Sequence, residues 1–112
     1  MKKELLLAAN IDYENGKKRF AGNTVLYEKY LLKFREDKHF DEAMAAYDRR
    51  DYDTLLKETH TLKGVAGTLG LLDIYQKSSE IVAALRAGEK EQIPELVNQL
   101  QKTYKEILVV LN

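Results

Sequence analysis

Hydrophobic residues recur along most of this chain at intervals of three and four positions, the spacing that places them on one face of an α-helix. The chain contains one proline, and few runs of β-branched residues interrupt the pattern. Both features favour helix over strand. The stripes predict helices over residues 24–34, 40–47, 52–69, 71–87 and 93–111.

Residues that begin or end helices stand between these stripes. A side-chain oxygen at an N-cap accepts a hydrogen bond from a first-turn amide, and glycine ends a helix in the left-handed conformation. The predicted N-caps are Asp12, Thr24 and Asp51, the first of them opening a short helix through Phe20. The predicted stops are Gly22, Gly70 and Gly88, and Pro94 fits the first turn of the last helix.

The stripes before and after residue 37 lie on roughly opposite sides of a helical wheel. The first ends at Phe34 and the second begins at Phe40. Because one straight helix cannot bury two opposite faces, a break or sharp bend is predicted between Asp37 and His39.

The connections between the predicted helices are short, so consecutive helices are expected to pack antiparallel. The sequence therefore predicts an all-α fold, an up-down antiparallel four-helix bundle with an additional short N-terminal helix. The chain of 112 residues is expected to form one domain, residues 1–112. We expect a monomer, because a bundle of this size closes its own core.

Charge and composition exclude several kinds of partner and site. Lysine plus arginine equals aspartate plus glutamate, at 18 each, so no net field favours nucleic acid or an anionic membrane. The absence of cysteine removes disulfides and thiolate sites, and it fits a cytoplasmic protein. The apolar stretch at residues 5–9 is too short for a signal peptide or a membrane span, and it predicts a short helix or an amphipathic lead-in.

One face of the predicted helix over residues 52–69 combines a histidine, a lysine and two glycines. At about 100° per residue, these residues fall within a sector of roughly 100° beside the apolar face. They are His60, Lys63, Gly64 and Gly67. A glycine inside a helix costs about 1 kcal/mol relative to alanine, so two of them beside a histidine indicate that another molecule approaches this surface closely. Gly67 has a second explanation, the close packing of a neighbouring helix.

The sequence around this face resembles the signature of histidine phosphotransfer (HPt) domains of multistep two-component phosphorelays. The signature is His-x-Leu-Lys-Gly followed by a glycine six residues later. It is met by His60, Leu62, Lys63, Gly64 and Gly70. The segments Ile-Asp at 11–12 and Phe-Ala-Gly-Asn at 20–23 are similar to the start of the family's domains, and the resemblance covers about residues 11–111.

The chemistry of a phosphoryl carrier suits these residues. A neutral imidazole has a lone pair for attack on phosphorus, and the resulting phosphoramidate keeps a high transfer potential. Lys63 is placed to neutralise phosphoryl oxygens on a modified His60, and Lys57 is a second candidate for this task. Gly64 and Gly67 would clear the surface for a partner. These two glycines and Lys57 are the predicted docking residues.

Further expectations are implied by the resemblance alone. The phosphorylated atom would be Nε2 of His60. The partners would be response-regulator receiver domains and a hybrid sensor histidine kinase, and the receiver would supply the phosphorylated aspartate and Mg²⁺. The chain itself would bind no metal or cofactor. Without ATP-binding machinery, it would act as a phosphoryl carrier with no kinase activity of its own.

Three other functions stay open. The phosphorylated N-terminal domain of a chemotaxis-type histidine kinase has a similar bundle and motif, but it takes phosphate from an ATP-binding domain. A helical adaptor would dock on a receiver without carrying phosphate, and it has no need of His60 and Lys63. A scaffold with an incidental His60 leaves the two glycines unexplained. The other histidine, His39, lies in the predicted break and is interpreted as a surface or capping residue.

Overall fold

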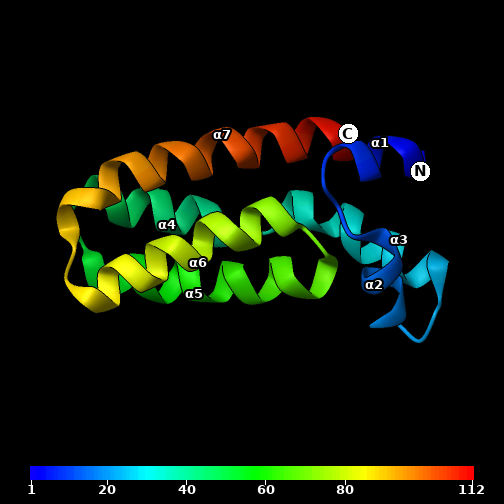
Figure 1. Ribbon diagram of the computed structural model, residues 1–112, viewed down its shortest axis with the longest axis horizontal. Coiled ribbons are helices and arrows are strands. Elements are labelled where there is room, and N and C mark those ends of the chain that lie inside the picture. Colours follow the sequence, from blue (N-terminus) through cyan, green and yellow to red (C-terminus); the bar gives the residue numbers. More distant parts are fainter.

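Four helices run side by side and alternate in direction along the chain (Figure 1). They are α4 (His39–Asp48), α5 (Tyr52–Leu69), α6 (Leu72–Ala87) and α7 (Ile93–Leu111). The computed structural model describes all 112 residues and contains no named strand. The predicted all-α, up-down four-helix bundle is therefore confirmed.

Three further helices precede the bundle and lie at one end of it, where both chain termini also lie (Figure 1). They are α1 (Lys3–Ala8), α2 (Tyr13–Lys18) and α3 (Thr24–Lys33). The short helix predicted after Asp12 is α2. The leucine-rich start of the chain forms a second short helix, α1, which buries Leu6. No helix combines the length and the apolar composition needed to cross a membrane.

The chain bends between α3 and α4, as the opposite phases of their apolar stripes predict. A 3-10 turn, η1 (Phe34–Glu36), leads to Asp37, whose extended backbone stops the helix. The carboxylate of Asp37 accepts a hydrogen bond from the His39 amide at 2.9 Å and lies 3.0 Å from Nδ1 of His39. Asp37 and His39 therefore fix the start of α4. A second 3-10 turn, η2 (Lys90–Gln92), joins α6 to α7.

Two of the three predicted N-caps are confirmed. The side chains of Asp12 and Asp51 accept hydrogen bonds from first-turn amides of α2 and α5, at 3.3 and 3.1 Å. The prediction of Thr24 is wrong by one residue, because Asn23 caps α3 and accepts from the Leu26 amide at 3.0 Å. Asparagine and threonine both cap helices, so neighbouring candidates are not separated by sequence alone.

The predicted glycine stops of the two central helices are confirmed. Gly70 ends α5 with φ 78°, and Gly88 ends α6 with φ 73°, both in the left-handed region. The two glycines differ in their surroundings. A Cβ atom at Gly70 would lie 2.6 Å from the carbonyl oxygen of Asp12, whereas one at Gly88 would meet no atom within 4 Å.

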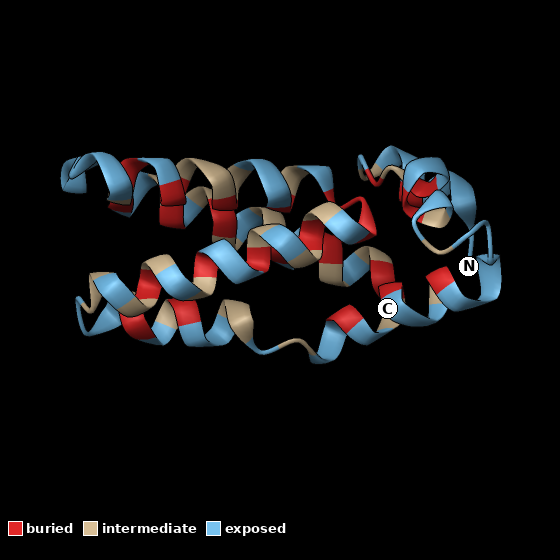
Figure 2. Ribbon diagram, turned by 90° about the horizontal axis from the view of Figure 1, so that it is seen from below, coloured by how far each residue is buried: buried red, intermediate tan, exposed pale blue.

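Buried residues lie on the sides of the bundle helices that face one another (Figure 2). Tyr104 of α7 is 5 % exposed and stacks on Phe40 of α4, with ring centroids 3.8 Å apart. Its ring also lies 5.6 Å from that of Phe34 in η1. These aromatic contacts attach α7 to the bend between α3 and α4.

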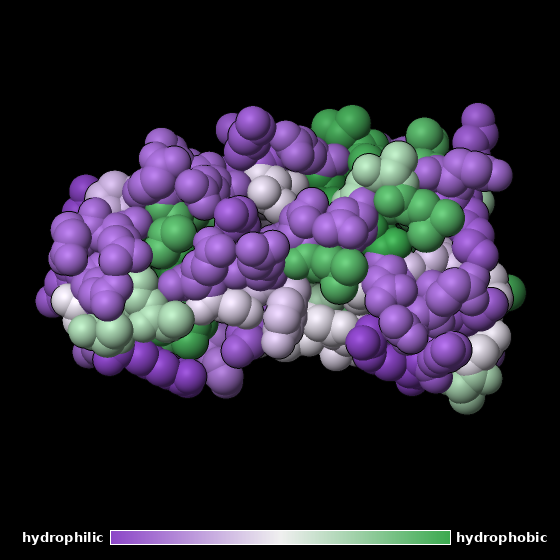
Figure 3. All heavy atoms as spheres, in the orientation of Figure 1, coloured by the Kyte–Doolittle hydropathy of each residue, from purple (hydrophilic) through white to green (hydrophobic).

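The exposed hydrophobic surface on the face in Figure 3 gathers toward the end of the molecule that carries α1 and the C-terminal part of α7. Leu5 and Leu7 of α1 and Val109 of α7 are the large apolar residues exposed in these two elements, besides Met1 before α1. Helix α5 lies along the opposite edge of this view (Figure 1). The apolar end is thus separate from the helix that carries His60.

Candidate functional site

His60 lies in the middle of α5 and points away from the bundle core. Its side chain is exposed, and no hydrogen bond or ion pair engages the ring. The core face of the same helix is formed by Leu55, Leu62, Ala66 and Leu69, which are at most 5 % exposed. The wheel position predicted for His60, beside the core face and accessible from solvent, is therefore observed.

Gly64 leaves the surface one turn beyond His60 open. A Cβ atom added at Gly64 would meet no atom within 4 Å apart from its own helix and chain neighbours, so packing does not require a glycine here. A glycine inside a helix is destabilising by about 1 kcal/mol relative to alanine. The structure offers no compensating contact within the chain.

A groove of about 640 Å³ runs beside Gly64, between α5 and the segment from α2 to η1. We call it the α5 groove. Gly64 and Thr68 line one wall, and Phe20 and Tyr30 line the other, with their rings stacked at 5.5 Å. Charged residues Lys33, Glu36 and Asp37 also border it. The groove thus combines an aromatic wall with charges of both signs.

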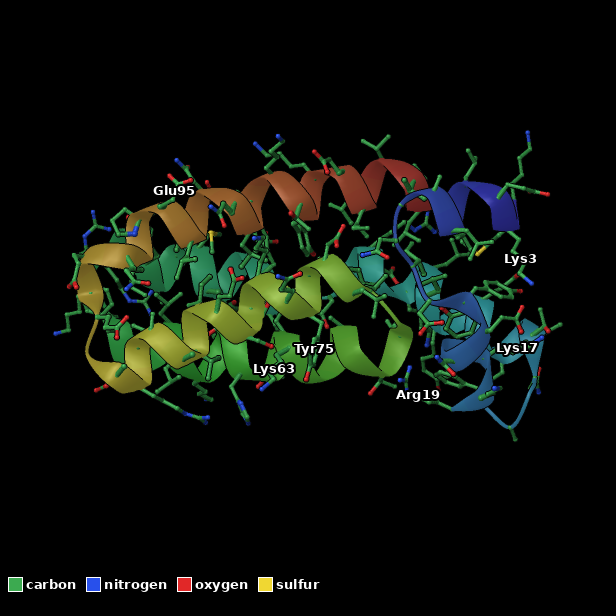
Figure 4. All side chains as sticks on the ribbon, in the orientation of Figure 1. Lys3, Lys17, Arg19, Lys63, Tyr75 and Glu95 are labelled. Atoms are coloured by element: carbon green, nitrogen blue, oxygen red, sulfur yellow. The ribbon has the colours of Figure 1, made fainter.

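Lys63 and Gly67 lie on the other side of the His60 sector, next to α6. The ammonium of Lys63 sits over the ring of Tyr75, 5.7 Å from its centroid, and Figure 4 shows the two side chains next to each other. A Cβ atom at Gly67 would lie 3.2 Å from Cδ2 of the same ring. The structure thus supports the packing explanation for Gly67. Lys57 is exposed and forms no ion pair.

Comparison with known proteins identifies the family. The family model of the Hpt domain matches residues 31–109, which include the whole of α5 and the motif from His60 to Gly70. The chain belongs to the Hpt domain family. No curated protein and no solved structure matches it. Family membership assigns the chain to histidine phosphotransfer in two-component signalling, with receiver domains and kinases as the family's partners.

The C-terminal end of α5 in this Hpt domain is held by residues that precede the matched range. Three groups donate to the last carbonyl oxygens of the helix: the Tyr27 hydroxyl to Leu69 at 2.7 Å, the Arg19 guanidinium to Thr68 at 3.3 Å, and the Asp12 amide to Gly70 at 2.8 Å. We call these three contacts the N-terminal clasp. Burial raises the pKa of Tyr27 to about 12, because its phenolate form would lose solvation.

The sequence did not identify the clasp or the role of Tyr75. Tyr75 lies on the apolar stripe that predicts the helix over residues 71–87, yet it is 41 % exposed and contacts α5 through Gly67 and Lys63. A tyrosine on the edge of a stripe, eight residues beyond a helix-interior glycine, is the available sequence signal. No group of three histidine, cysteine, aspartate or glutamate side chains is placed to hold a metal ion.

Proposed function

We propose that this Hpt domain accepts a phosphoryl group on His60 from the aspartate of one receiver domain and donates it to another. The observation that carries the proposal is the exposed, unengaged His60 ring beside the open surface at Gly64. The match of the Hpt family model across this segment supports the choice of histidine. We also propose that it works as a cytoplasmic monomer.

The proposed step exchanges one bond to phosphorus for another. The Nε2 lone pair of His60 forms the new N–P bond while the P–O bond to the receiver aspartate breaks, and the carboxylate leaves with the electron pair. The reverse sequence passes the group on. Phosphoryl transfer depends mainly on positioning and charge stabilisation, so an exposed histidine on a rigid helix can provide half of a site. We expect the receiver to supply Mg²⁺ and Lys63 to bind phosphoryl oxygens.

The α5 groove is the surface on which we expect the receiver to dock. Its aromatic wall, Phe20 and Tyr30, offers apolar contact area, and Lys33 and Asp37 border it with opposite charges. Gly64 belongs both to the groove and to the helical turn after His60, which allows a partner loop to approach the ring. Lys57 is exposed on the same helix and remains a predicted docking residue.

The test is mass spectrometry after mixing with a receiver domain phosphorylated on its aspartate. The wild-type protein should gain one phosphoryl group that is lost in acid and survives mild alkali. His60→Gln should remain unlabelled. The matched control is His39→Gln, which removes the only other histidine and should label like wild type.

Other outcomes would assign a different function. If His60→Gln is labelled and His39→Gln is not, the assignment of His60 as the phosphorylation site is overturned. Binding to several receivers without any label would favour an adaptor. Label transferred from the ATP-binding domain of a histidine kinase, and none from receivers, would favour the chemotaxis-type kinase domain.

A further inference from the structure

Tyr75 occupies a distinctive place next to the proposed phosphorylation site. It lies in the first turns of α6, and its ring rests against α5 at Gly67, one turn beyond Lys63. Its hydroxyl makes no hydrogen bond within the protein, so the ring itself accounts for its contacts with α5. A side chain at position 67 would crowd this ring. Gly67 therefore makes room for Tyr75 beside the His60 sector.

Lys63 has no acidic partner in the structure. No ion pair involves its ammonium, and the contact recorded for it is with the face of the Tyr75 ring at 5.7 Å. A lysine side chain is long and loses rotamer freedom whenever it is ordered. The electron-rich face of an aromatic ring attracts a cation, so Tyr75 limits the positions that the Lys63 ammonium visits.

We propose that Tyr75 is a positioning residue for phosphotransfer, acting through Lys63. The inference rests on the proposed function of His60. The ring holds the Lys63 ammonium on the α6 side of His60. Lys63 therefore loses less conformational entropy when it binds phosphoryl oxygens. Phosphorylation of His60 then becomes faster. Tyr75 itself touches neither the phosphoryl group nor the partner.

The test uses phosphoramidate, a small phosphodonor that needs no receiver docking. Nε2 of His60 forms an N–P bond as the P–N bond of the zwitterionic donor breaks and ammonia leaves with the electron pair. Tyr75→Leu should slow labelling about two- to fivefold, the size expected for an exposed cation–π contact. Tyr75→Phe keeps the ring face and should label at the wild-type rate.

A double-mutant cycle shows whether Tyr75 acts through Lys63. In a Lys63→Gln background, Tyr75→Leu should cause no further slowing. Gly67→Ala displaces the Tyr75 ring. It should slow labelling when Lys63 is present and have no effect in the Lys63→Gln background. Thermal unfolding of each variant checks that the fold is retained, and the exposed position of Tyr75 predicts that it is.

Several results would overturn the inference. The first is that Tyr75→Leu slows labelling equally with and without Lys63. The second is that Tyr75→Leu labels at the wild-type rate or faster. The third is that Tyr75→Phe labels as slowly as Tyr75→Leu. Failure of wild-type protein to label at His60 would defeat the proposed function and this inference together. NMR separates the two failures, since the ring-current shift of the Lys63 ε-methylene protons should vanish in Tyr75→Leu and persist in Tyr75→Phe whether or not phosphate is transferred.

Discussion

The three glycines of the motif segment have different surroundings, and each surrounding implies a different cost for a side chain. At Gly64 a Cβ atom meets open space, at Gly67 it meets the Tyr75 ring, and at Gly70 it meets the backbone of Asp12. Stability within the domain therefore explains Gly67 and Gly70 but leaves Gly64 without an internal reason. The proposed docking of a receiver would supply this reason.

We predict that Gly64→Ala stabilises the domain while impairing transfer. Alanine is a better helix former by about 1 kcal/mol, and its methyl group meets no atom of the chain. The same methyl group would stand in the path of a docking receiver. Urea denaturation should show the gain in stability, and transfer from a phosphorylated receiver should slow while labelling by phosphoramidate stays unchanged. Equal slowing with both donors would contradict a docking role.

At the scale of the helix, α5 is fixed at both of its ends. Asp51 caps its start through the amide and the hydroxyl of Thr54, at 3.1 and 2.6 Å. The N-terminal clasp satisfies carbonyl oxygens at its other end. A helix anchored in this way holds His60 at a constant place relative to the α5 groove and to α6. That constancy suits the phosphotransfer that we propose for His60.

The helix-ending glycines Gly70 and Gly88 form a matched pair for a second prediction. Their φ values of 78° and 73° impose a similar left-handed penalty on alanine, about 1 kcal/mol in each case. Gly70→Ala also places a methyl group 2.6 Å from the Asp12 carbonyl, so it must displace backbone. Chemical denaturation should show a clearly larger loss of unfolding free energy for Gly70→Ala than for Gly88→Ala. Equal losses would mean that the backbone at Asp12 moves to accommodate the methyl group with little change in free energy.

Sequence periodicity predicted those features of the elements that depend on neighbours along the chain. The bend at Asp37 followed from the phases of two adjacent stripes, and the stop at Gly70 followed from one residue. Contacts between distant segments carry no such signal. The Tyr27 hydroxyl reaches a carbonyl 42 residues away, and Tyr75 lies on the apolar stripe of its helix although it is exposed. The roles of His60, Lys63 and Lys57 stay predictions.

For the molecule as a whole, three tyrosines lie where its parts join. Tyr13 donates a hydrogen bond to Glu28 at 2.6 Å, Tyr27 belongs to the clasp, and Tyr104 attaches α7 to α4. The pKa of each is raised to about 12, for Tyr13 chiefly by the bond to Glu28 and for the other two by burial. Each raised pKa means that folding favours the neutral phenol.

These values predict how stability falls in alkali. A raised phenol pKa contributes stability that is fully present below the unfolded value of about 10 and is lost as pH rises through about 12. The domain should therefore unfold over this interval, with phenolate absorbance and helical circular dichroism changing together. Tyr104→Phe should remove part of the phenolate signal at high pH. Complete ionisation of all tyrosines with the helices intact would contradict this account.

The N-terminal clasp also bears on the kinetics of folding. Helices α4 to α7 follow one another through short turns, whereas two of the clasp contacts join residues 42 and 49 positions apart. Closing longer loops costs more chain entropy, so we expect the clasp to form after the bundle has largely assembled. Interactions formed after the transition state alter the unfolding rate more than the folding rate. In stopped-flow experiments, weakening the clasp should therefore shorten the lifetime of the folded domain and leave its rate of formation nearly unchanged.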